Sequence, residues 1–522
     1  MAVLGTLIKS CIKLFKSIEG TNNTPAKMQI NELKSLLKKA RHTDFGFKYN
    51  FNEILKRNSD DHLLHLFKEN VPVFTYSQIN KEWWSFARQG EENVCWPGKV
   101  KYFATSSGTS EASTKYIPLT QDMINAIQKT GVRQLFTLEH YDLPECFFET
   151  EVLMISGCTS LTDKGCYFEG DLSGIQALQL PFWFKGFYRP GKKIASIKDW
   201  SDKIDAIARN ASKWDVGVIM GVPSWNQILL ERIISFNRVK NIHEIWPNLK
   251  IFVHGGVALE PYMNGFNKLL GKPLIYMETY LASEGFLAYQ SQPSNKTLSL
   301  VLDNGVFFEF IAFTEENFTE DGDLKPDSII LSIDQTLPDT EYAILISTCS
   351  GAWRYLIGDV IKFTGDKQNE IIITGRTKHF LSLIGEHLSV DNMNEAIRQV
   401  SDELKIDIRE FTVTGVPYQS LFAHQWYIGT DDTTSAQIIK DKLDRKLKEL
   451  NKDYKTKRNI SLKEIYVDVI PSYYFYKWLK MQNKEGGQNK FPRVLKEDKL
   501  KAWQDFIVSE HALRQNQEVK IQ

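Results

Sequence analysis

Cysteine is scarce in this sequence, with six residues in a chain of 522, and those six are widely scattered. None of them forms a Cys-x-x-Cys pair, and the closest two, Cys158 and Cys166, have no histidine partners at the spacing of a zinc site. This scarcity argues against a disulfide-stabilised scaffold and a zinc-binding module. It favours reduced thiols in a cytoplasmic protein.

The sequence also lacks an excess of charge of either sign and lacks long apolar runs. Basic and acidic residues balance at 64 each, so no net field favours nucleic acid or an anionic membrane. No uninterrupted apolar run reaches the roughly 18 residues that a membrane-spanning helix requires. We therefore expect a cytoplasmic monomer without a nucleic-acid or membrane partner.

The first residues of the chain have the pattern of an amphipathic helix. Lys9, Lys13 and Lys16 recur at helical spacing and interrupt every apolar run, which is unlike the continuous apolar centre of a signal peptide. We expect this helix to dock on the protein's own core. The alternative is that it lies on a membrane surface.

A stretch rich in Ser and Thr, residues 105–110, follows the β-prone residues 102–104. Its spacing matches neither the GxxxxGK[ST] pattern of a P-loop nor the GxGxxG pattern of a dinucleotide fold. Its hydroxyl and N–H groups can still donate to phosphate oxygens, Gly108 lets the backbone approach a ligand, and Lys115 adds a positive charge. From these residues alone, a polar surface loop is an equally good interpretation.

The length of the chain predicts at least two domains. Residues 27–90 have the apolar spacing of helices with short breaks. From about residue 150, helical patterns alternate with four apolar runs, at residues 152–155, 216–220, 249–253 and 274–277. This rhythm predicts parallel strands with crossover helices, and the loops at their carboxyl ends should share one edge: residues 221–224, 254–257 and 279–284.

Beyond residue 300 the pattern becomes antiparallel and then changes again. The β-rich runs are residues 306–313, 341–348, 360–364 and 371–374. A smaller unit follows, with helices from Asp391 and at 435–451 and with β runs at 411–416, 425–428 and 465–469. We therefore predict an α/β protein with a large N-terminal domain of residues 1–377 and a small C-terminal α/β domain of residues 378–522.

Five motifs occur in one order along the chain. They are SSGTS with Lys115, YLASEGF at 280–286, WRYLIGDV at 353–360, GRTKHFLSLIGEHLS at 375–389 and QNKFPR at 488–493. Together they resemble the GH3 family of acyl-acid amido synthetases, a branch of the adenylate-forming superfamily. The resemblance covers essentially the whole chain.

The resemblance implies both an architecture and a reaction. The architecture is a large domain of α/β layers with a β-barrel portion, followed by a small mobile lid. The reaction uses ATP and Mg²⁺ in two steps. A small carboxylic acid attacks the α-phosphate of ATP, giving an acyl-adenylate and pyrophosphate. An amine, usually that of an amino acid, then attacks the activated carbonyl and expels AMP.

The resemblance also implies roles for individual residues. The nucleotide would be bound by Ser106, Ser107, Gly108, Thr109, Ser110, Lys115, Gly255, Gly256, Val257, Tyr280, Ala282, Ser283, Asp359 and Arg376. Glu284 matches the glutamate that helps to hold Mg²⁺, and Lys490 matches a lysine that neutralises charge on the transferring groups; both are expected to be catalytic. Asp359 matches the carboxylate that accepts the ribose hydroxyls. Lys378 lies at the hinge position.

The acid pocket is expected beyond Gln121 and around Pro223 and Trp225, although Trp225 fits a core position equally well. For histidines such as His254 a structural or hydrogen-bonding role is favoured, because aminolysis of an adenylate needs only a neutral amine. Two alternative functions stay open. One is a ligase that forms thioesters with coenzyme A, and the other is a non-catalytic protein that binds an adenylate or an acid on the same fold.

Overall fold

The structure, a computed structural model, divides by its internal contacts into two units. The large unit comprises Met1–Gly256 and Gly271–Ile373, and the small unit comprises Val257–Leu270 and Thr374–Gln522. The residues it describes are 23–57, 59–106, 115–259, 262–293, 295–319, 322–365, 368–377, 388–418, 421–451, 454–455, 458, 462–482, 484, 486, 490–495 and 497–519. The predicted N-terminal amphipathic helix lies outside them.

The large unit begins with helices, which confirms the prediction for residues 27–90. They are α2 (Pro25–Ala40), α3 (Asp44–Lys48), α4 (Phe51–Leu55), α5 (Asp60–Asn70), α6 (Tyr76–Ile79), a π-helical turn (Asn80–Trp84) and α7 (Ser85–Gln89). The Thr24 hydroxyl caps α2 by accepting from Lys27 N at 3.3 Å. Leu33, Leu36 and Leu37 are fully or almost fully buried on one face of α2, where they join the main core.

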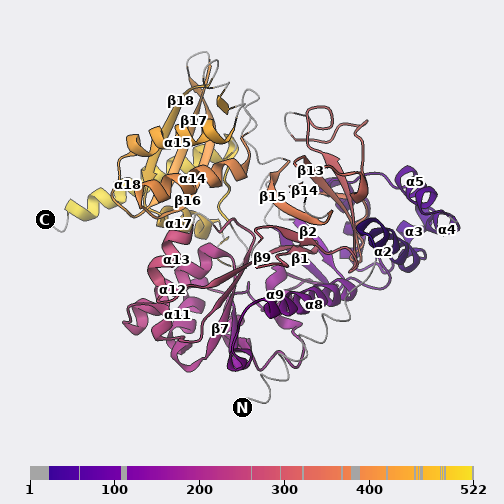
Figure 1. Cartoon of the computed structure of the whole chain (residues 1–522), viewed down its shortest axis with the longest axis horizontal. Coiled ribbons are helices and arrows are strands. Elements are labelled where there is room, and N and C mark those ends of the chain that lie inside the picture. The colour runs from indigo at the N-terminus through magenta and orange to yellow at the C-terminus, as the bar shows by residue number, and fades with distance from the viewer. Residues whose placement is uncertain are drawn as a thin grey trace. The chain divides into compact units, whose positions relative to one another are not determined.

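Eleven strands form the central sheet of the large unit in the order β12-β13-β14-β15-β11-β10-β9-β8-β7-β3-β6. Their bounds are β3 (Glu151–Met154), β6 (Tyr188–Arg189), β7 (Val216–Gly221), β8 (Ile251–Gly255), β9 (Ile275–Ala282), β10 (Gly285–Tyr289), β11 (Leu298–Leu300), β12 (Val306–Ala312), β13 (Glu341–Thr348), β14 (Tyr355–Phe363) and β15 (Glu370–Arg376). Figure 1 labels several of them.

Strands β6, β3, β7, β8 and β9 run parallel, and this confirms the predicted parallel sheet. The helices in this part of the sequence are α9 (Leu172–Leu178), α10 (Lys192–Ala195), α11 (Trp200–Asn210), α12 (Pro223–Asn237) and α13 (Met263–Leu269). Among the described residues, the antiparallel strands expected as a barrel continue this same sheet beyond β9. Short 3₁₀ helices cover Thr137–His140, Glu145–Glu149, Ala211–Lys213, Ile242–Glu244 and Ile333–Gln335.

A second sheet has the order β2-β1-β5-β4, and α8 (Gln121–Phe136) follows β2. Its strands are β1 (Tyr102–Ser106), β2 (Lys115–Leu119), β4 (Thr162–Asp163) and β5 (Phe168–Gly170). Strand β1 includes the first two residues of the predicted Ser/Thr stretch, and Lys115 begins β2, where it pairs with Ser106. Thr120 caps α8 by accepting from Met123 N at 3.2 Å.

Strand β14, which bears Asp359, is held by a buried ion pair at its start. Arg354 donates to both carboxylate oxygens of Glu309, at 2.9 and 3.1 Å, and the two side chains are 4 % and 1 % exposed. A further nitrogen of Arg354 donates to the carbonyl oxygens of Lys68 and Val71, at 2.9 and 2.7 Å. These bonds satisfy the guanidinium, so the two buried charges are compensated and the position of β14 is fixed.

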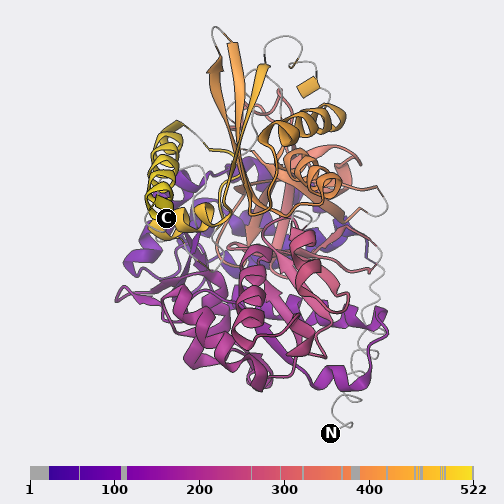
Figure 2. The same ribbon diagram turned by 90° about the vertical axis from the view of Figure 1, so that its left-hand side faces the viewer.

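The small unit is a three-stranded sheet, β16-β17-β18, with helices on both faces. The elements are α14 (Val390–Leu404), β16 (Ile408–Tyr418), β17 (Leu421–Thr430), α15 (Ala436–Leu450), β18 (Leu462–Ile470), α17 (Tyr473–Met481) and α18 (Glu497–Val519). Trp426 faces the core formed with α14 and α15, whereas Tyr427 contacts Trp503 of α18 on the other face. Figure 2 shows these strands upright with helices on either side. This order of elements confirms the predicted small α/β unit.

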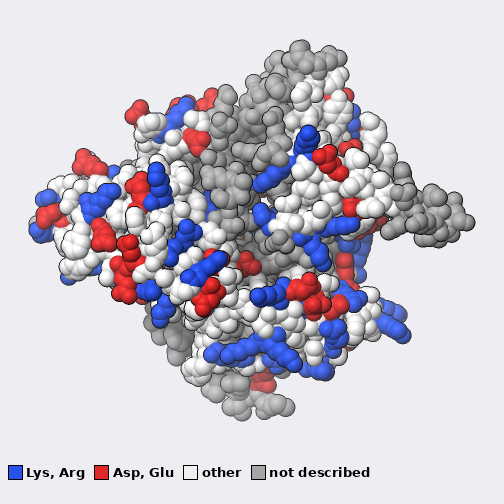
Figure 3. All heavy atoms as spheres, turned by 180° about the vertical axis from the view of Figure 1, so that it is seen from behind, with Lys and Arg blue, Asp and Glu red and all other residues white. Residues whose placement is uncertain are grey.

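No helix among the described residues combines the length and the apolar character that a membrane span needs. On the surface shown in Figure 3, basic and acidic side chains lie side by side over much of the described area. This mixture agrees with the equal numbers of the two charge types in the sequence.

Candidate functional site

The motif at residues 280–284 forms the end of β9 and the turn into β10. Ala282 pairs with Gly285 across the hairpin, so Ser283 and Glu284 make up its two-residue turn. Gly285 has φ +155°, and a Cβ there would lie 3.2 Å from the Met123 side chain. Glu284 is half-buried at the tip of this hairpin. Its carboxylate is therefore held at the end of a strand of the central sheet.

Two residues predicted to bind the nucleotide are in direct contact. The Tyr280 hydroxyl, on β9, donates to Asp359 Oδ2, on β14, at 2.6 Å. Tyr280 is 6 % exposed and Asp359 is half-buried. The contact fixes the direction of the Asp359 side chain.

The glycine pair at 255–256 lies at the carboxyl end of β8. A Cβ on Gly255 would lie 2.4 Å from Thr279 O and 2.6 Å from Thr279 Oγ1, so only glycine fits beside β9 at this point. Gly256 is exposed and has φ +84°. Gly221 of β7 pairs with His254, and Gly255 pairs with Thr279. The three loops predicted to share one edge of the sheet therefore do so.

Three buried polar atoms near this edge have no hydrogen-bond partner among the described residues. They are His254 Nδ1, the Tyr276 hydroxyl and Asn226 Oδ1. The rings of His254 and Tyr276 lie 6.4 Å apart, and a Cβ on Gly221 would lie 2.9 Å from the Asn226 amide nitrogen. Buried polar atoms are normally paired, so this cluster suits a ligand with polar groups.

Burial determines the charge state of this cluster. It lowers the pKa of His254 from 6.5 to about 4, so the imidazole is neutral at neutral pH. Burial also raises the pKa of Tyr276 to about 12, which keeps its hydroxyl protonated. Asn226 and Tyr276 were not predicted from the sequence. Single polar residues within apolar runs carry no sequence signal that separates a ligand contact from a core position.

The residues predicted for the acid pocket lie at the start of α12, directly after β7. Pro223 is the first residue of the helix, and both Pro223 and Trp225 are buried. The Trp225 ring packs edge-on against Trp200 of α11, with the ring centroids 5.1 Å apart. Trp225 thus has a core contact, and Pro223 positions the helix at the edge that carries His254.

The predicted phosphate loop is described only at its two ends. Ser106 and Lys115 pair across β1 and β2, and the Lys115 ammonium lies 5.3 Å from the centre of the Tyr76 ring. The remaining predicted loop residues are not among those that the structure describes: Ser107, Gly108, Thr109 and Ser110.

Four of the predicted residues belong to the small unit: Val257, Arg376, Lys378 and Lys490. Arg376 is half-buried at the end of β15, and Lys490 is exposed directly before the buried Phe491. Lys378, the predicted hinge residue, lies outside the described residues.

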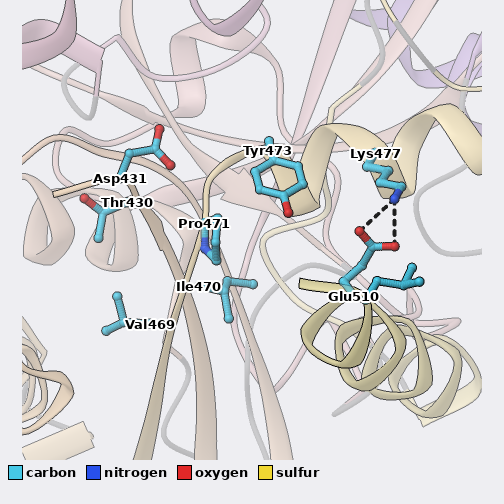
Figure 4. A pocket seen from close by; sticks show the side chains of 9 residues that line it. Thr430, Asp431, Val469, Ile470, Pro471, Tyr473, Lys477 and Glu510 are labelled. Carbon is cyan, nitrogen blue, oxygen red and sulfur yellow. Dashed lines mark hydrogen bonds and ion pairs between the residues drawn. The ribbon is translucent and has the colours of Figure 1, made fainter. Parts of the chain in front are cut away.

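Among the described residues, neither a metal cluster nor the cavity in the small unit coincides with the predicted site. In the part of the chain that the structure describes, no three His, Cys, Asp or Glu side chains are grouped to hold a metal ion. A cavity of about 560 Å³ opens at the carboxyl ends of β17 and β18, where Lys477 and Glu510 form a bidentate ion pair at 2.7 and 2.8 Å (Figure 4). None of the predicted site residues lines it.

Family models match nearly the whole chain in order. The GH3 family N-terminal domain matches residues 14–165 and 130–275, the GH3 family central domain matches residues 299–373, and the GH3 family C-terminal domain matches residues 391–499. The three models match successive parts of the sequence in the order N-terminal, central and C-terminal domain.

Individual relatives are more distant. Indole-3-acetic acid-amido synthetase GH3.4 of Arabidopsis thaliana is 22% identical over 420 residues, which are 68% of this chain and 67% of that protein. Jasmonoyl–L-amino acid synthetase JAR4 of Nicotiana attenuata is 28% identical over 182 residues, 33% of this chain and 30% of that protein.

Among solved structures, the GH3.15 acyl acid amido synthetase superposes with a TM-score of 0.74 at 17% identity and covers 96% of both chains. A 2-hydroxyisobutyryl-CoA ligase in complex with its acyl-AMP superposes with a TM-score of 0.58 at 11% identity, covering 92% of this chain and 91% of that chain. These two likenesses show that the fold is shared.

Proposed function

Because this chain belongs to the GH3 family, we propose that it is an ATP-dependent acyl-acid amido synthetase. It adenylates a small carboxylic acid, releases pyrophosphate, and then transfers the acyl group to an amine. The proposed amine is the amino group of an amino acid. The observation that carries the proposal is the contact between Tyr280 and Asp359. Two motifs 79 residues apart, each predicted to bind the nucleotide, meet in one hydrogen bond.

The proposed nucleotide site combines features of five strands of the large unit, β1, β2, β8, β9 and β14. Asp359 accepts the ribose hydroxyls, and its direction is set by Tyr280. Gly255 and Gly256 at the end of β8 present backbone without side chains to the adenine. The Ser/Thr loop that starts at Ser106, together with Lys115, binds the phosphates. The close pairing of Ser106 with Lys115 supports this role, since it brings the two ends of the loop together.

The acid is proposed to bind beside the nucleotide at the start of α12. Pro223 and Trp225 supply apolar surface, and His254, Tyr276 and Asn226 supply polar atoms that have no partner among the described residues. In the first step a carboxylate oxygen of the acid attacks the α-phosphorus, and the bond to pyrophosphate breaks. In the second, the nitrogen of a neutral amine attacks the acyl carbon, AMP departs with the electron pair, and the nitrogen loses a proton.

Lys490 and Glu284 are proposed to act on the charge that builds up during adenylation. The Lys490 ammonium neutralises the developing charge on the phosphoryl oxygens. Glu284 would hold Mg²⁺, which neutralises phosphate charge when bound. Magnesium commonly uses one or two protein carboxylates together with phosphate oxygens and water, and a single carboxylate at the hairpin tip fits that donor set.

The two units have different proposed roles. The large unit holds ATP and the acid, and the small unit acts as a mobile lid that brings Lys490 to the phosphates, with its hinge near Arg376 and Lys378. We also infer a cytoplasmic monomer without a nucleic-acid or membrane partner. The few cysteines and the balanced charge support this inference.

Pyrophosphate exchange and product analysis test this function together. The protein is incubated with ATP, Mg²⁺ and a panel of carboxylic acids, and acid-dependent exchange of labelled pyrophosphate into ATP is measured. Amino acids or coenzyme A are then added as acceptors. The proposal expects exchange with at least one acid and an amide product. A thioester alone would assign the chain to the coenzyme A ligases, and binding without exchange would indicate a non-catalytic protein.

A further inference from the structure

A buried ion pair and a tyrosine join two parts of the small unit that are far apart in sequence. Arg493 Nη1 lies 2.6 Å from Glu410 Oε2, and Arg493 Nη2 donates to the Tyr262 hydroxyl at 3.2 Å. The same hydroxyl donates to Glu410 Oε1 at 3.0 Å. Tyr262 is 1 % exposed, and the side chains of Glu410 and Arg493 are 6 % and 11 % exposed. Both charges are largely removed from water. Removing any one of the three side chains would therefore leave a buried polar group without its hydrogen-bond partner.

Arg493 belongs to the segment that begins at Lys490, and backbone bonds attach this segment to β16. Val413 N donates to Arg493 O at 2.9 Å, and the Thr412 hydroxyl donates to Pro492 O at 2.8 Å. The exposed Lys490 is thus only three residues from Arg493, whose side chain is held by Glu410 and Tyr262. The network therefore limits where the Lys490 backbone can lie within the small unit.

Tyr262 belongs to a segment, Val257–Leu270, that lies between two strands of the large unit in sequence but has its contacts in the small unit. Within this segment, Asn264 Nδ2 donates to Ser401 Oγ at 3.1 Å and to Asp402 Oδ1 at 3.3 Å, both on α14. Tyr262 and Asn264 thus attach the segment to β16 and α14 respectively.

A glycine of the large unit lies next to each end of this segment. Gly256 precedes Val257 and has φ +84°, a conformation that favours glycine. Gly271 follows Leu270, and a Cβ there would lie 2.6 Å from Asn241 Oδ1, so Gly271 is closely packed in the large unit. The chain therefore passes between the units directly beside a glycine at both places.

We propose that Tyr262 and Arg493 are positioning residues which, through Glu410, hold Val257–Leu270 and the Lys490 segment as one rigid body. The catalytic part of this inference rests on the proposed function. The network thereby limits where Lys490, which is proposed to act on the phosphates, can lie within the small unit. The chain crosses between the two units after Gly256, Leu270 and Ile373, and the hinge proposed near Arg376 and Lys378 follows the last of these crossings.

Hydrogen exchange of the full chain tests the rigid body without any substrate. Tyr262→Phe removes the hydroxyl and keeps the ring. Tyr454→Phe is the matched control, because Tyr454 is fully buried in the same unit and its hydroxyl donates to Asp444 at 2.9 Å. In Tyr262→Phe, amide exchange in residues 257–270 should accelerate about tenfold or more, whereas the control should leave those residues unchanged. Unchanged exchange there in Tyr262→Phe would overturn the inference.

Adenylation kinetics test the positioning role. Both tyrosine variants should lose stability in urea, and Tyr262→Phe should lose more, because its hydroxyl also accepts from Arg493 whereas the control loses one bond to a carboxylate. Only Tyr262→Phe should lower kcat for pyrophosphate exchange, by about fivefold or more, with the KM for the acid unchanged. Equal kinetic losses in the two variants would reduce Tyr262 to a structural role. If the wild-type chain shows no exchange with any acid, the proposed function fails, and the hydrogen-exchange result still decides whether the rigid body exists.

Discussion

Replacing Asp359 by Asn should weaken nucleotide binding specifically through the ribose. The amide keeps the size of the side chain and an acceptor for the Tyr280 hydroxyl, which lies 2.6 Å from Asp359 Oδ2. It loses the charge that the account assigns to the ribose hydroxyls. Hydrogen bonds to a charged group contribute about 1.5–3 kcal/mol each, so the Kd for AMP should rise about 10- to 150-fold.

The assay is calorimetric titration with two ligands, AMP and 2′,3′-dideoxy-AMP. In the wild-type protein the dideoxy compound should bind more weakly than AMP, because it cannot donate to the carboxylate. In Asp359→Asn the two ligands should have nearly the same Kd. The difference between the two ligands thus isolates the ribose contact from any general effect of the substitution on the fold.

Tyr280→Phe provides a graded control for the same contact. It retains the Asp359 carboxylate but removes the bond that orients it, so AMP should lose only about 1 kcal/mol of binding free energy. Strand β14 should stay in place, because Arg354 and Glu309 hold its start independently. If Asp359→Asn preserves the wild-type ratio between AMP and the dideoxy compound, the ribose is bound elsewhere and the reasoning is refuted.

Three further substitutions test other parts of the site. Glu284→Gln should slow ATP–pyrophosphate exchange by about tenfold or more, and near-normal exchange at limiting Mg²⁺ would remove Glu284 from the metal role. Lys490→Ala should severely slow adenylate formation while amide formation from a supplied acyl-adenylate stays near normal; equal loss of both steps would indicate a structural role. Because burial lowers the pKa of His254 from 6.5 to about 4, the unfolded chain takes up this proton first as the pH falls. The free energy of unfolding should therefore drop by up to about 3 kcal/mol between pH 6.5 and 4 through this group, and His254→Phe should abolish that part of the slope in urea titrations.

Local patterns made much of the fold predictable. The apolar runs that form β7 and β8 are bounded by helical patterns. Strands that alternate with helices in this way predict a parallel sheet, whatever the details of the packing. Thr120 was recognisable as a helix cap because its hydroxyl serves a backbone N–H only three residues away. The edge shared by the three loops followed from the common direction of the strands.

Contacts between distant parts of the chain were not predictable in the same way. The sequence around Tyr280 does not indicate that it contacts Asp359, and the same holds for Arg354 and Glu309. These side chains meet only when the strands that carry them come together in the sheet. Strand β2 was missed because its residues, including Pro118, give a weak strand signal that pairing with β1 overrides. The membership of Val257–Leu270 in the small unit likewise depends on the buried network around Arg493.

Isotope transfer tests the central claim, the formation of an acyl-adenylate, most directly. The carboxylic acid is labelled with ¹⁸O in both oxygens and incubated with the protein, ATP, Mg²⁺ and an amino acid, and the products are analysed by mass spectrometry. If the acid attacks the α-phosphorus and the amine then expels AMP, one labelled oxygen appears in AMP and the other stays in the amide. Label in inorganic phosphate, with ADP as the nucleotide product, would show that the acid is activated at the γ-phosphate and would contradict the account.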